Sequence, residues 1–170
     1  MATSKLKSLQ KVWKGNNEET KLKFLRALIF PIATYGSETW SISKEAEKKI
    51  NTFELRCYRR ILRIPWTAKR TNSSILTQFG NIPEQWLQDR IMRQKLKFFG
   101  HIKRHACLEK DIYEGIVPGK RGRGRPKRRW SQDITERLQT TVAQAGRKAQ
   151  DRDAYRRAVI DATSRRAYAT

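Results

Sequence analysis

The side chains best suited to chemistry are cations, and they are most concentrated between Pro118 and Trp130. These thirteen positions hold seven cations, three glycines, two prolines and no acid. Glycine gives the backbone great freedom, Pro126 lacks a backbone donor, and like charges repel, so the segment is not expected to fold alone. A phosphate backbone would neutralise the charge and release condensed counterions. The pattern predicts a disordered basic arm that binds nucleic acid through Lys120, Arg121, Arg123, Arg125, Lys127, Arg128 and Arg129.

The centre of this arm, Arg123-Gly-Arg-Pro126, resembles the core of an AT-hook, in which Arg-Gly-Arg lies extended along a narrow A·T-rich minor groove. Glycine allows the backbone to approach the groove floor, and a narrow groove concentrates negative potential that attracts arginine. A basic interdomain linker or a nuclear-import signal fits the same composition and remains an open alternative. A nuclear location is expected from the arm.

Positive charge is spread along the whole chain. The 170 residues include 38 Lys and Arg against 16 Asp and Glu, a formal net charge of +22. Self-repulsion of this size is usually tolerated where a polyanion offsets it, so nucleic acid is the first expected partner. The two cysteines, Cys57 and Cys107, make no disulfide framework, and the sequence shows no secretory signal and no apolar run of membrane-spanning length. An intracellular protein with no membrane partner is therefore expected.

The clearest amphipathic helix is predicted over residues 43–64. Its apolar stripe consists of Ala46, Ile50, Phe53, Cys57, Ile61 and Ile64. Arg56, Arg59 and Arg63 fall on the other side of the helix, which predicts a ridge that faces phosphates. A solvated charged face is the alternative.

An earlier helix is predicted over residues 20–36. Thr20 is suited to be its N-cap, and Gly36 can close it. Pro31 lies inside the apolar stripe and removes a backbone hydrogen bond, so it should kink the helix or split it in two.

A second cationic strip is expected on a helix that starts near Pro83. Trp86, Arg90, Arg93 and Lys97 recur at spacings of four, three and four residues. One aromatic ring followed by three cations suits a sugar–phosphate backbone with one stacked base. Trp86 fits a core position equally well, and that alternative stays open.

Residues that could catalyse a reaction or bind a metal do not gather in the sequence. His101, His105 and Cys107 are close together but lack the fourth ligand of a structural zinc site. The sequence has no adjacent aspartates for a two-magnesium centre, no Gly-rich phosphate loop and no Gly-x-Ser-x-Gly motif. We therefore expect no catalytic residue, no metal and no cofactor.

Helical periodicity resumes after the arm. Ser131, Thr141 and Asp151 are suited to cap three short helices that carry few large apolar side chains. The predicted fold is all-α, with a small helical bundle over residues 1–105, the basic arm over residues 106–130 and a short helical tail over residues 131–170. The tail should be marginal alone and should dock on the main body or become ordered on nucleic acid.

Five ordered blocks carry a resemblance that covers nearly the whole chain. They span residues 25–40, 53–66, 99–104, 122–134 and 149–153, and include Phe99-Gly-His-Ile-Lys-Arg104 and Gly122-Arg-Gly-Arg-Pro-Lys-Arg-Arg-Trp130. Together they resemble the C-terminal part of the endonuclease–reverse transcriptase of non-LTR (LINE-type) retrotransposons. In that family this part follows the catalytic palm and contains the thumb and the segment after it, which hold the template–primer duplex. The resemblance implies a thumb-like bundle, with the palm, its Asp-Asp metal site and the endonuclease outside this sequence.

The expected function is sequence-tolerant binding of RNA, an RNA–DNA hybrid or duplex DNA, without polymerase or endonuclease activity. A separate reverse-transcriptase palm is the further partner that the resemblance implies. The alternative is an AT-hook-like architectural or regulatory DNA-binding protein derived from a retrotransposon. A third hypothesis is a structural or interaction protein whose positive charge is only a solvated surface. It predicts no saturable binding of nucleic acid at physiological salt.

Overall fold

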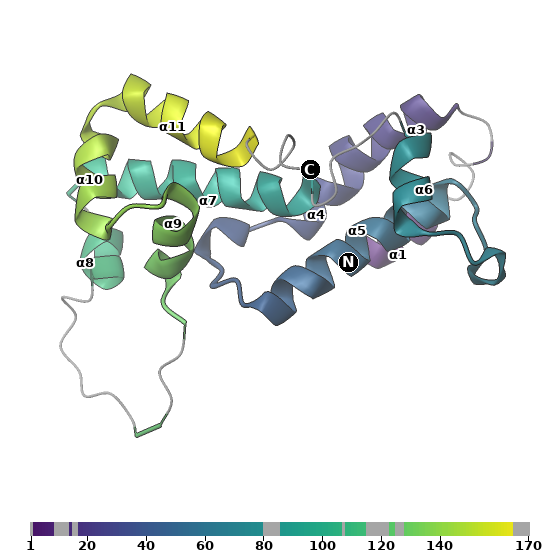
Figure 1. Cartoon of the computed structure of the whole chain (residues 1–170), viewed down its shortest axis with the longest axis horizontal. Coiled ribbons are helices and arrows are strands. Elements are labelled where there is room, and N and C mark those ends of the chain that lie inside the picture. Colours follow the sequence, from purple (N-terminus) through teal and green to yellow (C-terminus); the bar gives the residue numbers. More distant parts are fainter. Residues whose placement is uncertain are drawn as a thin grey trace. The chain divides into compact units, whose positions relative to one another are not determined.

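The protein is built from helices and the turns that join them (Figure 1). The computed structural model describes residues 2–8, 14, 17–79, 86–106, 108–114, 123–124 and 128–164. In chain order the elements are α1 (Ala2–Ser8), α3 (Glu18–Phe24), the π-helix η1 (Leu25–Ile29), α4 (Phe30–Ala33), the 3-10 helix η2 (Ser37–Thr39), α5 (Lys44–Ile61), the 3-10 helix η3 (Trp66–Ala68), α6 (Asn72–Gln78), α7 (Trp86–Arg104), α8 (Leu108–Glu114), α9 (Trp130–Leu138), α10 (Val142–Gln150) and α11 (Arg152–Ser164). No strand occurs within these described ranges, and the predicted all-α fold is confirmed.

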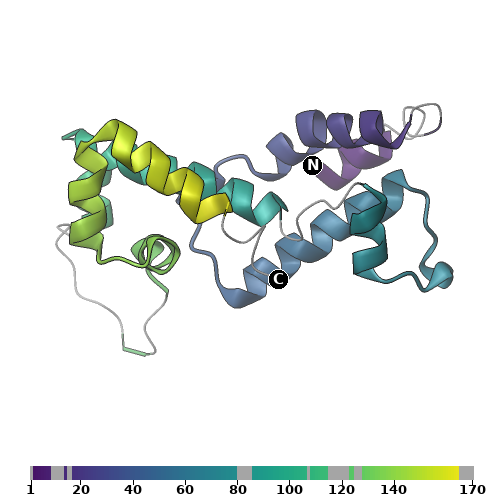
Figure 2. The same cartoon turned by 45° about the horizontal axis from the view of Figure 1, so that its top comes forward.

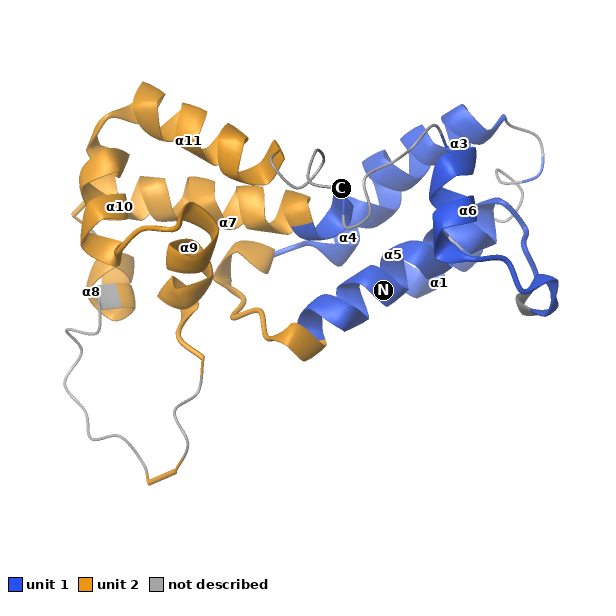
Figure 3. Cartoon of the chain, viewed as in Figure 1, with its two compact units in different colours: residues 1–36, 46–88 blue, residues 37–45, 89–170 orange. Residues whose placement is uncertain are grey.

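The chain divides into two compact units (Figure 3). Unit 1 comprises residues 1–36 and 46–88, and unit 2 comprises residues 37–45 and 89–170. Most of α7 therefore belongs to the same unit as α9, α10 and α11. This division differs from the expected one at residues 105 and 130, because the apolar face of α7 is covered by the C-terminal helices.

The core of unit 1 brings together α3, η1, α4, α5, α6 and the start of α7. Its buried apolar side chains are Leu22, Leu25, Ile29, Phe30, Cys57, Tyr58, Ile61, Ile75, Leu76 and Leu87. The buried face of α5 is rotated from the predicted stripe, since Phe53 is only half-buried whereas Glu54 and Tyr58 are buried. Glu54 Oε1 accepts a hydrogen bond from the Tyr58 hydroxyl at 2.6 Å, and Glu54 Oε2 accepts one from the Leu87 N–H at 3.1 Å. The buried carboxylate thus satisfies a backbone donor in the first turn of α7.

Pro31 does not split the helix that contains it. Glu18 to Ala33 form one continuous helical run in which the middle part, η1, is a π-helix. There the Phe30 N–H bonds to the carbonyl oxygen of Leu25, five residues earlier. A π-type turn beside a proline is one way to accommodate the lost α-helical hydrogen bond, because proline has no N–H to donate.

The helix ends follow the predicted capping chemistry with two exceptions. Thr141 Oγ1 accepts from the N–H three residues later at 3.3 Å, Asp151 Oδ1 does the same at 3.0 Å, and Gly36 has φ 66 at the end of its helical run. One exception is Ser131, which was expected to cap a helix but lies inside α9, because that helix begins at Trp130 and its N-cap is Arg129. The other exception is Thr20, which was expected to be an N-cap. Asn17 is the cap, and its side chain accepts from the Thr20 N–H at 2.8 Å, so the helix begins earlier than predicted.

In unit 2, α11 lies along α7 in both orientations of the chain (Figures 1 and 2). The two helices run antiparallel, because Tyr155 near the start of α11 meets Gly100, while Thr163 near its end accepts a hydrogen bond from Arg93 Nε at 3.2 Å. The shared core consists of Met92, Leu96, Phe99, Ile134, Ala145, Ala149, Tyr155 and Val159. The C-terminal helices are therefore part of the unit 2 core.

Candidate nucleic-acid interface

One side of α5 is lined with cations. Lys48, Lys49, Arg56 and Arg60 are exposed and Arg59 is half-buried. At 3.6 residues per turn these five positions fall within about a third of the helix circumference. Cys57, Tyr58 and Ile61 lie buried on the other side. We call these five cations the α5 cationic face.

The C-terminal end of this face departs from the prediction. Arg59 Nη2 donates to the carbonyl oxygen of Arg70 at 2.9 Å and to Asn72 Oδ1 at 3.0 Å, so this guanidinium also ties α5 to the start of α6. The helix was expected to reach residue 64 but ends at Ile61. Arg63 follows in the left-handed region, at φ 55, which terminates the helix and leaves the Arg63 side chain exposed beyond it.

The strip predicted on α7 is not a single exposed surface. Arg93 and Lys97 are exposed, whereas Arg90 and Trp86 are half-buried. The Trp86 ring lies 5.4 Å from the Phe30 ring, and the guanidinium carbon of Arg26 lies 4.5 Å from the Trp86 ring centroid. Of the two interpretations that the sequence left open for Trp86, these contacts favour the core position.

The residues that flank the basic arm meet in unit 2. Tyr113 lies in α8, which is helical although it falls within residues 106–130, where a disordered arm was predicted. Tyr113 precedes the cation-rich residues 118–130, Trp130 opens α9, and the two ring centroids are 4.2 Å apart. The Phe98 ring contacts both, at 6.1 Å and 6.3 Å, and Trp130 Nε1 donates to the carbonyl oxygen of Glu38 at 2.7 Å. The arm therefore begins and ends at one aromatic cluster. Because both flanking helices belong to unit 2, the arm does not connect the two units, and the interdomain-linker alternative does not fit.

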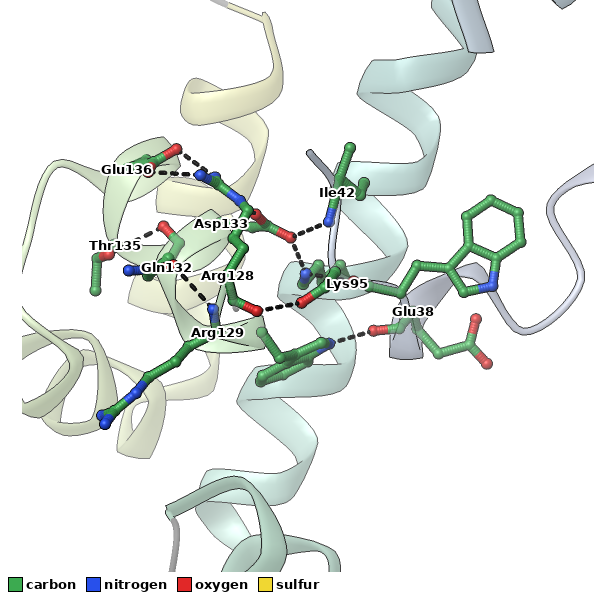
Figure 4. Close-up of polar contacts among 12 residues, drawn as sticks. Glu38, Ile42, Lys95, Arg128, Arg129, Gln132, Asp133, Thr135 and Glu136 are labelled. Carbon is green, nitrogen blue, oxygen red and sulfur yellow. Dashed lines mark hydrogen bonds and ion pairs between the residues drawn. The ribbon is translucent and has the colours of Figure 1, made fainter. Parts of the chain in front are cut away.

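Arg128, at the C-terminal root of the arm, is paired with acids of α9 (Figure 4). Its Nε donates to Asp133 Oδ1 at 2.7 Å, and its Nη2 donates to Glu136 Oε2 at 2.5 Å. The hydrogen bond to Glu136, followed by that to Asp133, raises the pKa of the Arg128 guanidinium. Among the predicted contact residues, Arg128 thus has a structural role, while its neighbour Arg129 is exposed.

A buried ion pair between Lys95 and Asp133 lies next to Arg128 and was not predicted from the sequence (Figure 4). Lys95 Nζ donates to Asp133 Oδ2 and, at 2.6 Å, to the carbonyl oxygen of Trp40. The Ile42 N–H donates to the same carboxylate oxygen at 3.0 Å. Burial lowers the pKa of the Lys95 ammonium, and the hydrogen bond to Asp133 opposes this shift. The pair joins α7, α9 and the segment before α5 within unit 2.

The middle of the arm is described only at Arg123 and Gly124. Arg123 is exposed, and Gly124 has φ 134, which an L side chain rarely adopts. The other predicted contacts of the arm, Lys120, Arg121, Arg125 and Lys127, lie outside the described residues.

Comparison with known proteins places no further constraint on the chain. No family model, no curated protein and no solved structure matches it. In the described part, no group of three or more His, Cys, Asp or Glu side chains could hold a metal ion, and no helix combines the length and apolar character of a membrane span. Fold and surface together define an all-α protein with a large excess of positive charge.

Proposed function

We propose that this chain is a sequence-tolerant nucleic-acid-binding module that corresponds to the thumb and post-thumb region of a non-LTR retrotransposon reverse transcriptase. Its ligand is RNA, an RNA–DNA hybrid or duplex DNA, and a separate palm supplies the polymerase chemistry. The observation that carries the proposal is the α5 cationic face.

The dimensions of this face suit one nucleic-acid strand. From Lys48 to Arg60 the helix rises about 18 Å at 1.5 Å per residue. A strand of duplex DNA places about five phosphates along that length, at 3.4 Å per phosphate. Between Lys48 and Phe79 the only acid in the sequence is Glu54, which is buried and bonded to Tyr58 and Leu87. Glu54 therefore does not neutralise this face, and Glu45, one turn before Lys48, is the exposed acid of α5 on the same side.

The basic arm supplies a second set of cations to the same ligand class. Tyr113 and Trp130, on either side of the cation-rich segment, are held together by their ring contact. Closing a loop in advance removes part of the chain entropy that would otherwise be lost on binding. This preorganisation supports binding by the arm without requiring base-specific contacts.

The test compares two variants that lose equal charge. The α5 variant replaces Lys49, Arg56 and Arg60 with Ala, and the control variant replaces the exposed α11 residues Arg152, Arg156 and Arg157 with Ala. Binding to a labelled RNA–DNA hybrid is measured by fluorescence anisotropy over a series of salt concentrations. For the α5 variant, the slope of log K against log salt should fall by up to about 2.7, or about 0.9 per lost phosphate contact, and the control slope should change less. Equal changes in the two variants would show that only net charge matters.

The alternative is an AT-hook-like architectural or regulatory DNA-binding protein. Two observations favour it. Arg123 is exposed, and its neighbour Gly124 has φ 134, a backbone conformation that L side chains rarely adopt. The same assay separates the two functions when A·T-rich and G·C-rich duplexes are added. A strong preference for the A·T-rich duplex supports the alternative, and a preference for the hybrid supports the reverse-transcriptase-derived function.

A further inference from the structure

Two histidines meet where α7 ends. His101 is in the last turn of the helix, and His105 follows the helix with its backbone N–H bonded to the carbonyl oxygen of Ile102 at 3.3 Å. Their ring centroids are 4.4 Å apart, the ring planes are inclined by 46°, and both residues are exposed. A spacing of four residues on a helix brings side chains to the same face, which explains the contact.

The separation of the rings is compatible with chelation of a metal ion. Ion–nitrogen distances of about 2.0–2.1 Å in a tetrahedral zinc site place two ligand nitrogens about 3.4 Å apart. Rings whose centres are 4.4 Å apart can bring one nitrogen each to that separation through modest side-chain rotation. Because both rings are exposed, neighbouring side chains do not enclose them and prevent this rotation.

The surroundings leave the ring nitrogens of both histidines available to bind a metal ion. In the part of the chain that the structure describes, neither imidazole has a hydrogen-bond partner. The two nearest cations in sequence are directed elsewhere, because Lys103 Nζ lies 5.6 Å from the Phe99 ring centroid and Arg104 Nη1 donates to the carbonyl oxygen of Ala149 at 2.9 Å. Lys97, one turn before His101 on α7, is exposed.

We propose that His101 and His105 form a two-histidine site for a divalent transition-metal ion, Zn²⁺ or Cu²⁺, with water completing the coordination. Imidazole nitrogen suits these borderline ions, whereas Mg²⁺ prefers oxygen ligands. This is an open surface site and not a structural zinc site, since two protein ligands leave positions for solvent. Metal binding would link the last turn of α7 to the residue beyond it and so stabilise the end of that helix. The proposal does not depend on the proposed function.

The first experiment measures metal binding by isothermal titration calorimetry on the full chain without an affinity tag. Cys107, which lies outside the described residues, is replaced with Ser so that its thiol does not bind the added metal. One Zn²⁺ or Cu²⁺ per chain should bind, with Cu²⁺ tighter than Zn²⁺ and no binding of Mg²⁺. His101→Ala and His105→Ala should each weaken binding by more than about tenfold, a loss at least as large as that from removing a supporting residue. The control Lys97→Ala should bind the metal at least as tightly, because a nearby positive charge is removed.

A second measurement uses the only two histidines in the sequence. Their imidazole Cε1–H signals are assigned with the two Ala variants and followed by NMR during a Zn²⁺ titration. Both signals should shift together at the same metal concentration. Shifts of one signal alone, unchanged affinity in both His variants, or the absence of Zn²⁺ and Cu²⁺ binding would each overturn the proposal.

Discussion

The contact between α7 and α11 depends on a glycine, and replacing that glycine should destabilise unit 2. A Cβ at position 100 would lie 2.6 Å from Cε1 and 2.9 Å from Cδ1 of Tyr155. The Tyr155 ring has little room to yield, because it is buried and its hydroxyl donates to the carbonyl oxygen of Leu96 at 2.9 Å. Gly100→Ala therefore forces either the ring or the helix to move.

The magnitude follows from two opposing effects. Replacing glycine with alanine inside a helix normally stabilises it by about 1 kcal/mol. Overpacking a core costs about 1–3 kcal/mol, and displacing the Tyr155 hydroxyl from its acceptor adds about 1–3 kcal/mol for a buried group left unpaired. The steric and hydrogen-bond losses exceed the helical gain, so we expect Gly100→Ala to lower the free energy of unfolding by about 1–5 kcal/mol.

Gly146 in α10 is the matched control. A Cβ there would meet only the Lys103 side chain, at 3.5 Å or more, which is an ordinary van der Waals distance. Gly146→Ala should therefore stabilise the protein by about 0.5–1 kcal/mol. Urea denaturation followed by far-ultraviolet circular dichroism measures both variants, and the two changes should have opposite signs.

Repeating Gly100→Ala in a variant that lacks the Tyr155 ring identifies the cause of the lost stability. In a Tyr155→Leu variant the ring that meets the new Cβ is absent, so most of the cost of Gly100→Ala should disappear in a double-mutant cycle. If Gly100→Ala is as stable as the wild-type chain, or if its cost is unchanged in the Tyr155→Leu background, the close approach of α11 to α7 is not the reason for glycine at this position.

Two further perturbations test other parts of the fold. Lys95→Met should lower the free energy of unfolding by about 3–5 kcal/mol in urea denaturation, because it leaves a buried carboxylate without its ammonium partner. The control Lys23→Met breaks an exposed ion pair and should cause no measurable change. Equal effects of the two substitutions would contradict the importance of burial. The free energy of unfolding should also fall at alkaline pH. Burial raises the pKa of the Cys57 thiol from 9.0 to about 12. Between these two pH values the folded state keeps a proton that the unfolded state loses, so rising pH favours the unfolded state. Burial also raises the pKa of Tyr58, which adds to the loss of stability at alkaline pH. The urea midpoint measured at increasing pH should drop less in Cys57→Ala than in the wild-type chain, and a midpoint that does not change up to pH 12 would contradict burial of these groups.

The helices could be predicted from the sequence because their signals are local. Amphipathic spacing located α5 and α7, and the caps Thr141 and Asp151 located the starts of α10 and α11. The exposed side of α5 could be predicted in the same way, because a helix that buries Cys57 and Ile61 must expose Arg56 and Arg60. The π-turn before Pro31 could not, since proline is compatible with a kink, a break or a register change, and packing decides among them.

Contacts between residues far apart in the sequence could not be predicted from such local patterns. The helical period puts Lys95 on the same face as the buried Ile91 and Ile102, and a lysine in an apolar stripe is a signal that a partner acid exists. The sequence does not say which acid it is, because Asp133 is 38 residues away and lies beyond the basic arm. The identity of that acid bears on function. Asp133 also binds Arg128, the arm residue next to Arg129, so the carboxylate that neutralises the buried lysine also fixes the point from which the basic arm leaves unit 2. Under the proposed function, Lys95→Met should therefore weaken binding of the labelled RNA–DNA hybrid, measured by fluorescence anisotropy, through the position of the arm as well as through stability.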